Sequence, residues 1–197
     1  FYGCTSLEGP LDLPDGVTDL GEYCFRNCTD LNGVTLPANL RQIGGGAFLD
    51  CSSLTSINIP KTLENVQGSA SVFEGTKLRE VSFDEGVTII PNRLFADCTE
   101  LERISLPGTL VEIRSDAFAR CTSLTNAVLP SGTTFVGSGA FSGCTALHWA
   151  YVPITIARTR KDVFTDCPDL TIISSERSMG AGYASAHDIP LRLLPTY

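Results

Sequence analysis

Eight cysteines are the residues of this chain with the widest chemical scope, since thiolates bind metals, form disulfides and act as nucleophiles. Seven of them occupy one position of a recurring pattern, three residues after a phenylalanine. They are Cys4, Cys28, Cys51, Cys98, Cys121, Cys144 and Cys167. In a stack of repeats these residues form a column with neighbours about 5 Å apart, the spacing of strands in a sheet.

A column of this kind favours inert thiols. It offers one ligand type at regular intervals, which is no tetrahedral zinc site. Stacked side chains point the same way, so each disulfide would require local distortion of the backbone. Free cysteine packs as a small hydrophobe. We therefore expect reduced, buried thiols, and we expect the same of Cys24, which takes a position held elsewhere by alanine.

The remaining reactive residues form no recognisable catalytic or metal site. The two histidines, His148 and His187, are about forty residues apart. The sequence contains no His-x-x-x-His, Cys-x-x-Cys or Gly-x-Ser-x-Gly pattern. The glycines at 44–46 lack the lysine of a phosphate-binding loop. The sequence predicts no enzyme activity, no cofactor and no metal.

The elements that hold these residues repeat along the chain. The marker phenylalanines are spaced 22 to 25 residues apart. They are Phe1, Phe25, Phe48, Phe73, Phe95, Phe118, Phe141 and Phe164. One such unit cannot bury its own apolar face, whereas stacked units cover one another. The Phe73 unit lacks the cysteine and has two extra residues around 67–71, so we expect a bulge there and the weakest unit of the stack.

Each unit carries a Leu-x-x-Ile-x-Leu-Pro segment, whose last apolar residues alternate as in a half-buried strand. All units run in the same direction, which predicts parallel pairing. We expect eight strands, beginning near Leu7, Leu31, Leu54, Leu78, Leu101, Leu124, Leu147 and Leu170. Gly21, Gly44 and Gly137 are expected to supply turns with positive φ, and residues 115–120 a short helical turn.

The repeat resembles the bacterial BspA-like class of leucine-rich repeats. Residues 28–48 read Cys-Thr-Asp-Leu-Asn-Gly-Val-Thr-Leu-Pro-Ala-Asn-Leu-Arg-Gln-Ile-Gly-Gly-Gly-Ala-Phe. The family pattern is close to Cys-x-x-Leu-x-x-Ile-x-Leu-Pro-x-x-Leu-x-x-Ile-Gly-x-x-Ala-Phe. The resemblance implies an α/β fold, a right-handed leucine-rich-repeat solenoid with one parallel sheet of about eight strands and short helical or 3-10 turns. It also implies bacterial surface display and adhesion.

The two ends of the chain differ. Residues 1–175 are predicted to form the solenoid. Residues 176–197, with a small-residue helix and a short apolar strand, are predicted to cap it within the same domain. No comparable cap is visible before residue 1, so we expect an open N-terminal edge that could associate with another chain or segment. The chain begins inside a repeat, as a fragment of a longer protein would.

Charge and hydropathy exclude some partners. The net charge of −8 disfavours nucleic acid. No run of 18 apolar residues is present, so we expect no membrane insertion within this chain. An extracellular or cell-surface location is expected, with no signal or anchor within the sequence.

One cluster breaks the polar pattern of the outward strand positions. Side chains alternate between the two faces along a strand. Counted from the inward repeat positions, this alternation places Val128, Trp149, Tyr151 and Ile172 on the outer face of the sheet, with His148 beside them. Exposed apolar clusters mark interaction sites, and Trp and Tyr are favoured anchors. Alternatively, the cap or a neighbouring domain covers this cluster. The sequence favours a non-catalytic surface module that binds a protein or glycan, with a structural spacer as the alternative.

Overall fold

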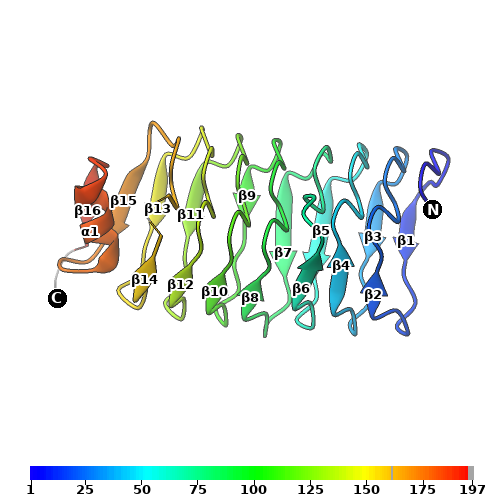
Figure 1. The fold of residues 1–197 in the computed structure, drawn as a ribbon, viewed down its shortest axis with the longest axis horizontal. Coiled ribbons are helices and arrows are strands. Elements are labelled where there is room, and N and C mark those ends of the chain that lie inside the picture. Colours follow the sequence, from blue (N-terminus) through cyan, green and yellow to red (C-terminus); the bar gives the residue numbers. More distant parts are fainter. Residues whose placement is uncertain (161, 195–197) are drawn as a thin grey trace.

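The computed structural model describes residues 1–160 and 162–194. The chain winds into an elongated β-solenoid of about eight turns (Figure 1). One side of the solenoid is a column of eight strands, one per repeat. These strands are β1 (Pro10–Asp12), β3 (Gly33–Thr35), β5 (Ser56–Ile59), β7 (Glu80–Phe83), β9 (Arg103–Ile104), β11 (Asn126–Val128), β13 (Trp149–Tyr151) and β15 (Thr171–Ser174).

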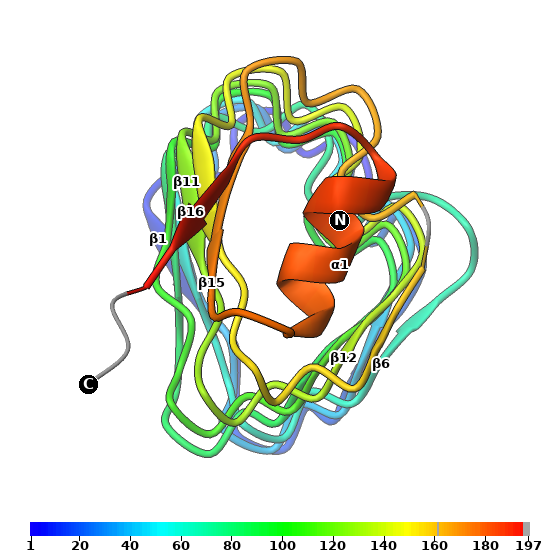
Figure 2. The ribbon, with the colours of Figure 1, turned by 90° about the vertical axis from the view of Figure 1, so that its left-hand side faces the viewer.

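A second column of shorter strands, which the sequence did not predict, runs along the opposite side (Figures 1 and 2). These strands are β2 (Asp19–Leu20), β4 (Gln42–Gly44), β6 (Asn65–Gln67), β8 (Ile89–Ile90), β10 (Glu112–Ile113), β12 (Phe135–Val136) and β14 (Arg158–Thr159). They arise from a second pair of apolar residues in each unit, three positions apart and ahead of the next phenylalanine, such as Leu40 and Ile43. Strands β2, β6, β8, β10 and β12 each place one buried residue on the core side, as Ile113 does in β10, and β4 places Ile43 there.

Every strand pair in the described residues is parallel, and the pairs in the middle of the solenoid join corresponding positions of successive repeats. Ile57 lies opposite Val81, for example, and Ala127 opposite Ala150. The predicted stack of eight parallel strands is thus confirmed. The ladder of the first column is interrupted after β3 and after β9, so it forms three sheets in one row rather than one.

The marker phenylalanines form a continuous stack through the core. Neighbouring rings are 5.2–5.6 Å apart between centroids and within 15° of parallel. The cysteines lie beside this stack, and each buried thiol donates a hydrogen bond to the phenylalanine carbonyl of the preceding repeat. Cys51 donates to Phe25 at 3.1 Å, and Cys144 to Phe118 at 3.2 Å. The Phe-x-x-Cys motif therefore links one rung to the next.

All eight cysteines are free, as expected. Six are buried, but Cys4 is exposed and Cys24 is half-buried, so the expectation of burial was wrong for these two. Both lie at the N-terminal end of the described stack.

The run expected to be helical, residues 115–120, consists of successive turns. Asp116 and Arg120 adopt positive φ of 55° and 58°. This geometry directs alternate backbone groups to the neighbouring rung: the Phe95 N–H donates to Ala117 at 2.8 Å, and the Asp97 N–H to Ala119 at 2.8 Å. A helix would use those groups internally, so the bonds between rungs explain the difference.

The expected role of Gly21, Gly44 and Gly137 was also wrong, because none of the three has positive φ. Gly137 is required for close approach instead. A Cβ there would lie 2.6 Å from the Ser115 N of the preceding rung, and one on Gly44 would overlap the backbone of Glu22. A Cβ on Gly21 would meet no described atom within 4 Å.

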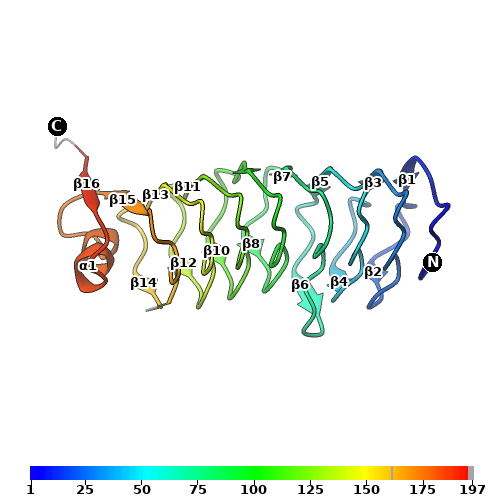
Figure 3. The same cartoon turned by 90° about the horizontal axis from the view of Figure 1, so that it is seen from above.

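The Phe73 unit contains the expected bulge. The loop after β6 extends beyond the other rungs in Figure 3, and Gly68 within it has φ of 79°. Thr76 compensates for the missing cysteine: it is buried, and its hydroxyl donates to the Phe73 carbonyl at 2.7 Å. The low stability expected of this unit stays a prediction.

The C-terminal segment contains helix α1 (Met179–Ala186) and strand β16 (Leu191–Leu193), and Figure 2 shows α1 lying across the end of the solenoid. Ser178 caps α1, its hydroxyl accepting from the Ala181 N–H at 3.0 Å. Tyr183 packs edge-on against Phe164, with centroids 5.8 Å apart, and so terminates the ring stack. Strand β15 ends at Ser174, next to the predicted boundary at 175; residues 195–197 of the predicted cap lie outside the described residues.

Candidate functional site

Outward side chains of the first column form one face of the solenoid. We call this surface the sheet face. Its N-terminal half is polar and forms a shallow groove of about 500 Å3. The polar groups there bond to one another: Ser82 donates to Asn58 at 2.9 Å, and Asn58 donates to Asp84 at 2.7 Å.

The C-terminal half of the sheet face carries the aromatic residues. The predicted alternation of inward and outward side chains along β13 is confirmed. Ala150 is fully buried, while Trp149 and Tyr151 on either side of it point outward and are half-buried. Val128 lies beside Tyr151 on the preceding strand and is 50% exposed. His148, just before β13, is exposed.

Ile172 does not belong to this cluster, contrary to expectation. It is fully buried, and Ile173 lies outward in its place, opposite Tyr151. The last repeat has one residue fewer between its leucine and the paired strand: Trp149, two residues after Leu147, lies opposite Thr171, one residue after Leu170. A shift of one residue exchanges the two faces of a strand.

Arg192 is a member of the site that sequence reasoning missed. It belongs to the cap strand β16, where it lies opposite Ile173. It borders, with His148, Trp149, Thr171 and Ile173, a shallow hollow of about 390 Å3. The repeat pattern ends before β16, so only the pairing of β16 with β15 reveals this neighbour. We call these residues, with Tyr151 and Val128, the aromatic patch.

The described part of the cap lies beside the aromatic patch. Strand β16 extends the sheet at its edge, while α1 packs against β14, β15 and β16 at the end of the core (Figure 2). With α1 and β16 in place, Val128 and His148 are exposed and Trp149 and Tyr151 are half-buried. A flat surface with aromatic anchors, a cation and a histidine can bind a ligand but offers no aligned nucleophile and base.

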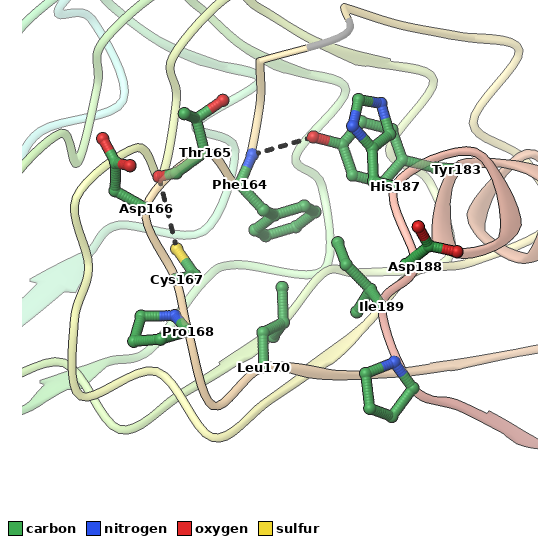
Figure 4. Close-up of a pocket in the computed structure, with 11 residues that line it drawn as sticks. Phe164, Thr165, Asp166, Cys167, Pro168, Leu170, Tyr183, His187, Asp188 and Ile189 are labelled. Atoms are coloured by element: carbon green, nitrogen blue, oxygen red, sulfur yellow. Dashed lines mark hydrogen bonds between the residues drawn. The ribbon is translucent and has the colours of Figure 1, made fainter.

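A second hollow, of about 450 Å3, lies between the last rung and the cap (Figure 4). On its wall, the Tyr183 hydroxyl accepts from the Phe164 N–H at 3.2 Å, and the His187 ring stacks on that of Tyr183 with centroids 4.3 Å apart. Burial raises the pKa of the Cys167 thiol to about 12, which makes it a poor nucleophile. The tyrosine and the thiol of this hollow therefore serve the joint between solenoid and cap.

Burial likewise raises the pKa of Cys51 to about 12 and the pKa values of Cys98 and Cys121 well above the ordinary thiol range. Within residues 1–160 and 162–194, no three histidine, cysteine or acidic side chains come together in a way that could hold a metal ion. No helix of the described chain is long and apolar enough to cross a membrane.

A family model described as the BspA-type leucine-rich repeat region matches residues 1–71 and 69–181, with 6 copies. Among solved structures, the chain is similar to a leucine-rich repeat protein of Treponema pallidum, with a TM-score of 0.58 and 23% identity over 85% of this chain and 69% of that one.

It also resembles a leucine-rich cell surface protein of Faecalibacterium prausnitzii, with a TM-score of 0.49 and 21% identity. The alignment covers 93% of this chain and 64% of that one, so the present chain spans less than two thirds of its length. A search of curated protein sequences gave no match.

Proposed function

The chain belongs to the BspA-type leucine-rich repeat family, and on this premise we propose that it is a non-catalytic recognition module of a bacterial surface protein. Stacked repeats provide extended surfaces that such proteins use for binding. In this proposal the module takes part in adhesion, and its ligand is a protein, or else a glycan, of another surface. The aromatic patch is the binding site.

The observation that supports this proposal is the asymmetry of the sheet face. Its N-terminal half has small polar groups that bond to one another, whereas its C-terminal half carries the half-buried Trp149 and Tyr151 and the exposed Val128. Partly exposed aromatic residues beside a cation have the composition of binding hot spots. An apolar patch of this kind favours a protein ligand over a glycan.

Paired substitutions on the two halves of the face test the proposal. The labelled domain is applied to arrays of extracellular proteins and of glycans, as wild type, as Trp149→Ala and as Ser56→Ala. Loss of a hot-spot residue weakens binding by about 2 kcal/mol or more, about 30-fold. We expect Trp149→Ala to lose binding and Ser56→Ala, in the polar half, to retain it.

The same experiment distinguishes the alternative, a structural spacer. A spacer gives no specific binding on either array, or binding that Trp149→Ala leaves unchanged. Either result contradicts the proposed recognition function. Binding to the glycan array alone retains the site and changes the class of its ligand.

A further inference from the structure

The outer edge of β16 is an unpaired strand edge. Strand β16 lies at the end of its sheet and is hydrogen-bonded to β15 alone among the described strands. Figure 3 shows it as the last strand of the row. An open strand edge presents backbone donors and acceptors that suit another extended chain.

Backbone direction identifies the groups on that edge. The Pro190 carbonyl accepts from the Ile172 N–H at 2.8 Å, and the Leu194 N–H donates to Ser174 at 3.0 Å. Both groups therefore point toward β15. Because successive residues of a strand point their backbone groups to opposite sides, the N–H and C=O groups of Leu191 and Leu193 point to the open side.

The side chains of β16 fit an added strand. Leu191 and Leu193 are 39% and 44% exposed, large fractions for leucine in a strand. Arg192 lies between them on the sheet face, beside the hollow that contains Trp149. A neighbouring strand would place an alternating apolar and acidic pattern against these three residues.

The opposite end of the same column lacks these properties. Strand β1 begins with Pro10, which has no N–H to offer, and ends with the charged Asp12. Proline and charge are devices by which proteins protect strand edges from pairing. Strand β16 has a cation but retains both of its outward N–H groups.

We propose that the outer edge of β16 binds an extended acidic peptide segment as an additional strand, with an acidic side chain beside Arg192 and apolar side chains against Leu191 and Leu193. This inference rests on the function proposed above, because it names the partner that reaches the aromatic patch. The net charge of −8 repels an acidic segment elsewhere, so Arg192 directs it to this edge.

The test uses the peptide acetyl-Ser-Thr-Ile-Glu-Ile-Thr-Ser-amide and two N-methylated forms, one methylated at the glutamate and one at both isoleucines. Binding is followed by two-dimensional NMR of the 15N-labelled protein at millimolar peptide. We expect the Leu191 and Leu193 amide signals to shift. A strand bonded along one edge uses alternate N–H groups, so one methylated form should lose binding and the other should keep it. Equal binding of both forms, loss of both, or no shift with the parent peptide contradicts the inference.

Variants of the protein provide a second measurement. Leu193→Pro removes an outward N–H without removing a bond to β15, and should weaken binding about tenfold. Arg192→Gln should weaken it about two- to fivefold for the glutamate peptide and leave a glutamine peptide unaffected. Leu193→Ala is the matched control, which keeps the N–H and should bind more tightly than Leu193→Pro.

The outcomes separate this inference from the proposed function. If Trp149→Ala abolishes array binding while the peptide leaves β16 unchanged, the recognition function stands and the added strand does not. If the peptide binds β16 but the arrays show no ligand, the reverse holds. Shifts of Leu191 and Leu193 that depend on protein concentration without peptide would assign the edge to a second copy of this chain, and contradict the inference.

Discussion

The first and last rungs contain the same Phe-x-x-Cys motif in opposite surroundings. Phe1 is 71% exposed and Cys4 is exposed, whereas Phe164 is 6% exposed and Cys167 is buried. The difference lies in what stacks on each rung. Tyr183 of the cap closes the C-terminal end of the ring stack, and no described residue closes the N-terminal end. Burial is thus a property of the stack rather than of the unit.

The middle of the stack should respond to ring removal far more than its open end. We expect Phe118→Ala to lower the free energy of unfolding by about 3–5 kcal/mol, because it removes a fully buried ring between two others. Phe1→Ala should cost less than about 1 kcal/mol. Urea unfolding followed by circular dichroism measures both. Equal losses would mean that stacking does not determine the contribution of a rung.

The cap should behave as one more rung. Tyr183→Ala is expected to cost about 2–4 kcal/mol, since it uncovers Phe164 and the end of the core. Tyr183→Phe retains the ring and loses the bond to the Phe164 N–H, at a cost of about 1 kcal/mol. The readouts are the urea midpoint and the labelling rate of Cys167. If Tyr183→Ala leaves that rate unchanged, the ring does not seal the end.

Alkaline pH should separate buried from exposed thiols. An unfolded thiol ionises near pH 9.0, whereas burial raises the pKa of folded Cys51 to about 12. The folded state therefore holds more protons in this range, so stability is complete below about pH 9 and decreases as pH rises toward 12. At pH 10 the ionisation of one such thiol in the unfolded state lowers the free energy of unfolding by about 1 kcal/mol.

Urea unfolding at pH 7.5 and pH 10 tests this effect. Cys51→Ala should lose less stability between the two pH values than the wild type. A thiol reagent should label Cys4 first in the native protein. The assignment is wrong if Cys51→Ala loses as much stability between the two pH values as the wild type does.

The sequence alone predicted the parts that follow from repetition. The spacing of the phenylalanines predicted the rungs, and the position shared by Cys51, Cys121 and Cys144 predicted a buried column. The sequence did not predict the second column of strands. Two apolar positions three residues apart, such as Leu110 and Ile113, do not show strand alternation, so the second column of strands was missed.

The candidate site was predicted only in part, for a related reason. Trp149 and Tyr151 follow the repeat, so parity placed them correctly. Ile172 lies after a one-residue shortening, and the repeat pattern contains no information on which side of Leu170 the residue is lost. Arg192 lies outside the repeat altogether. Its place beside the hollow depends on the pairing of β16 with β15, a tertiary contact.

The smallest expected effect concerns the surface between rungs in the middle of the stack. Arg120 donates to Asp97 of the preceding rung at 2.6 Å, and its side chain is 50% exposed. Exposed ion pairs contribute little, so Arg120→Gln should cost less than about 1 kcal/mol at pH 7. The hydrogen bond from Arg120 lowers the pKa of Asp97 below 3.8. The contribution is therefore present above about pH 4 and is lost as pH falls through the lowered pKa.

Thermal unfolding of wild type and Arg120→Gln at pH 7 and pH 3 measures this contribution. The difference between the two proteins should be small at pH 7 and smaller at pH 3. If Arg120→Gln instead destabilises the chain as much as Phe118→Ala, then contacts on the surface, rather than the ring stack, hold the middle rungs together.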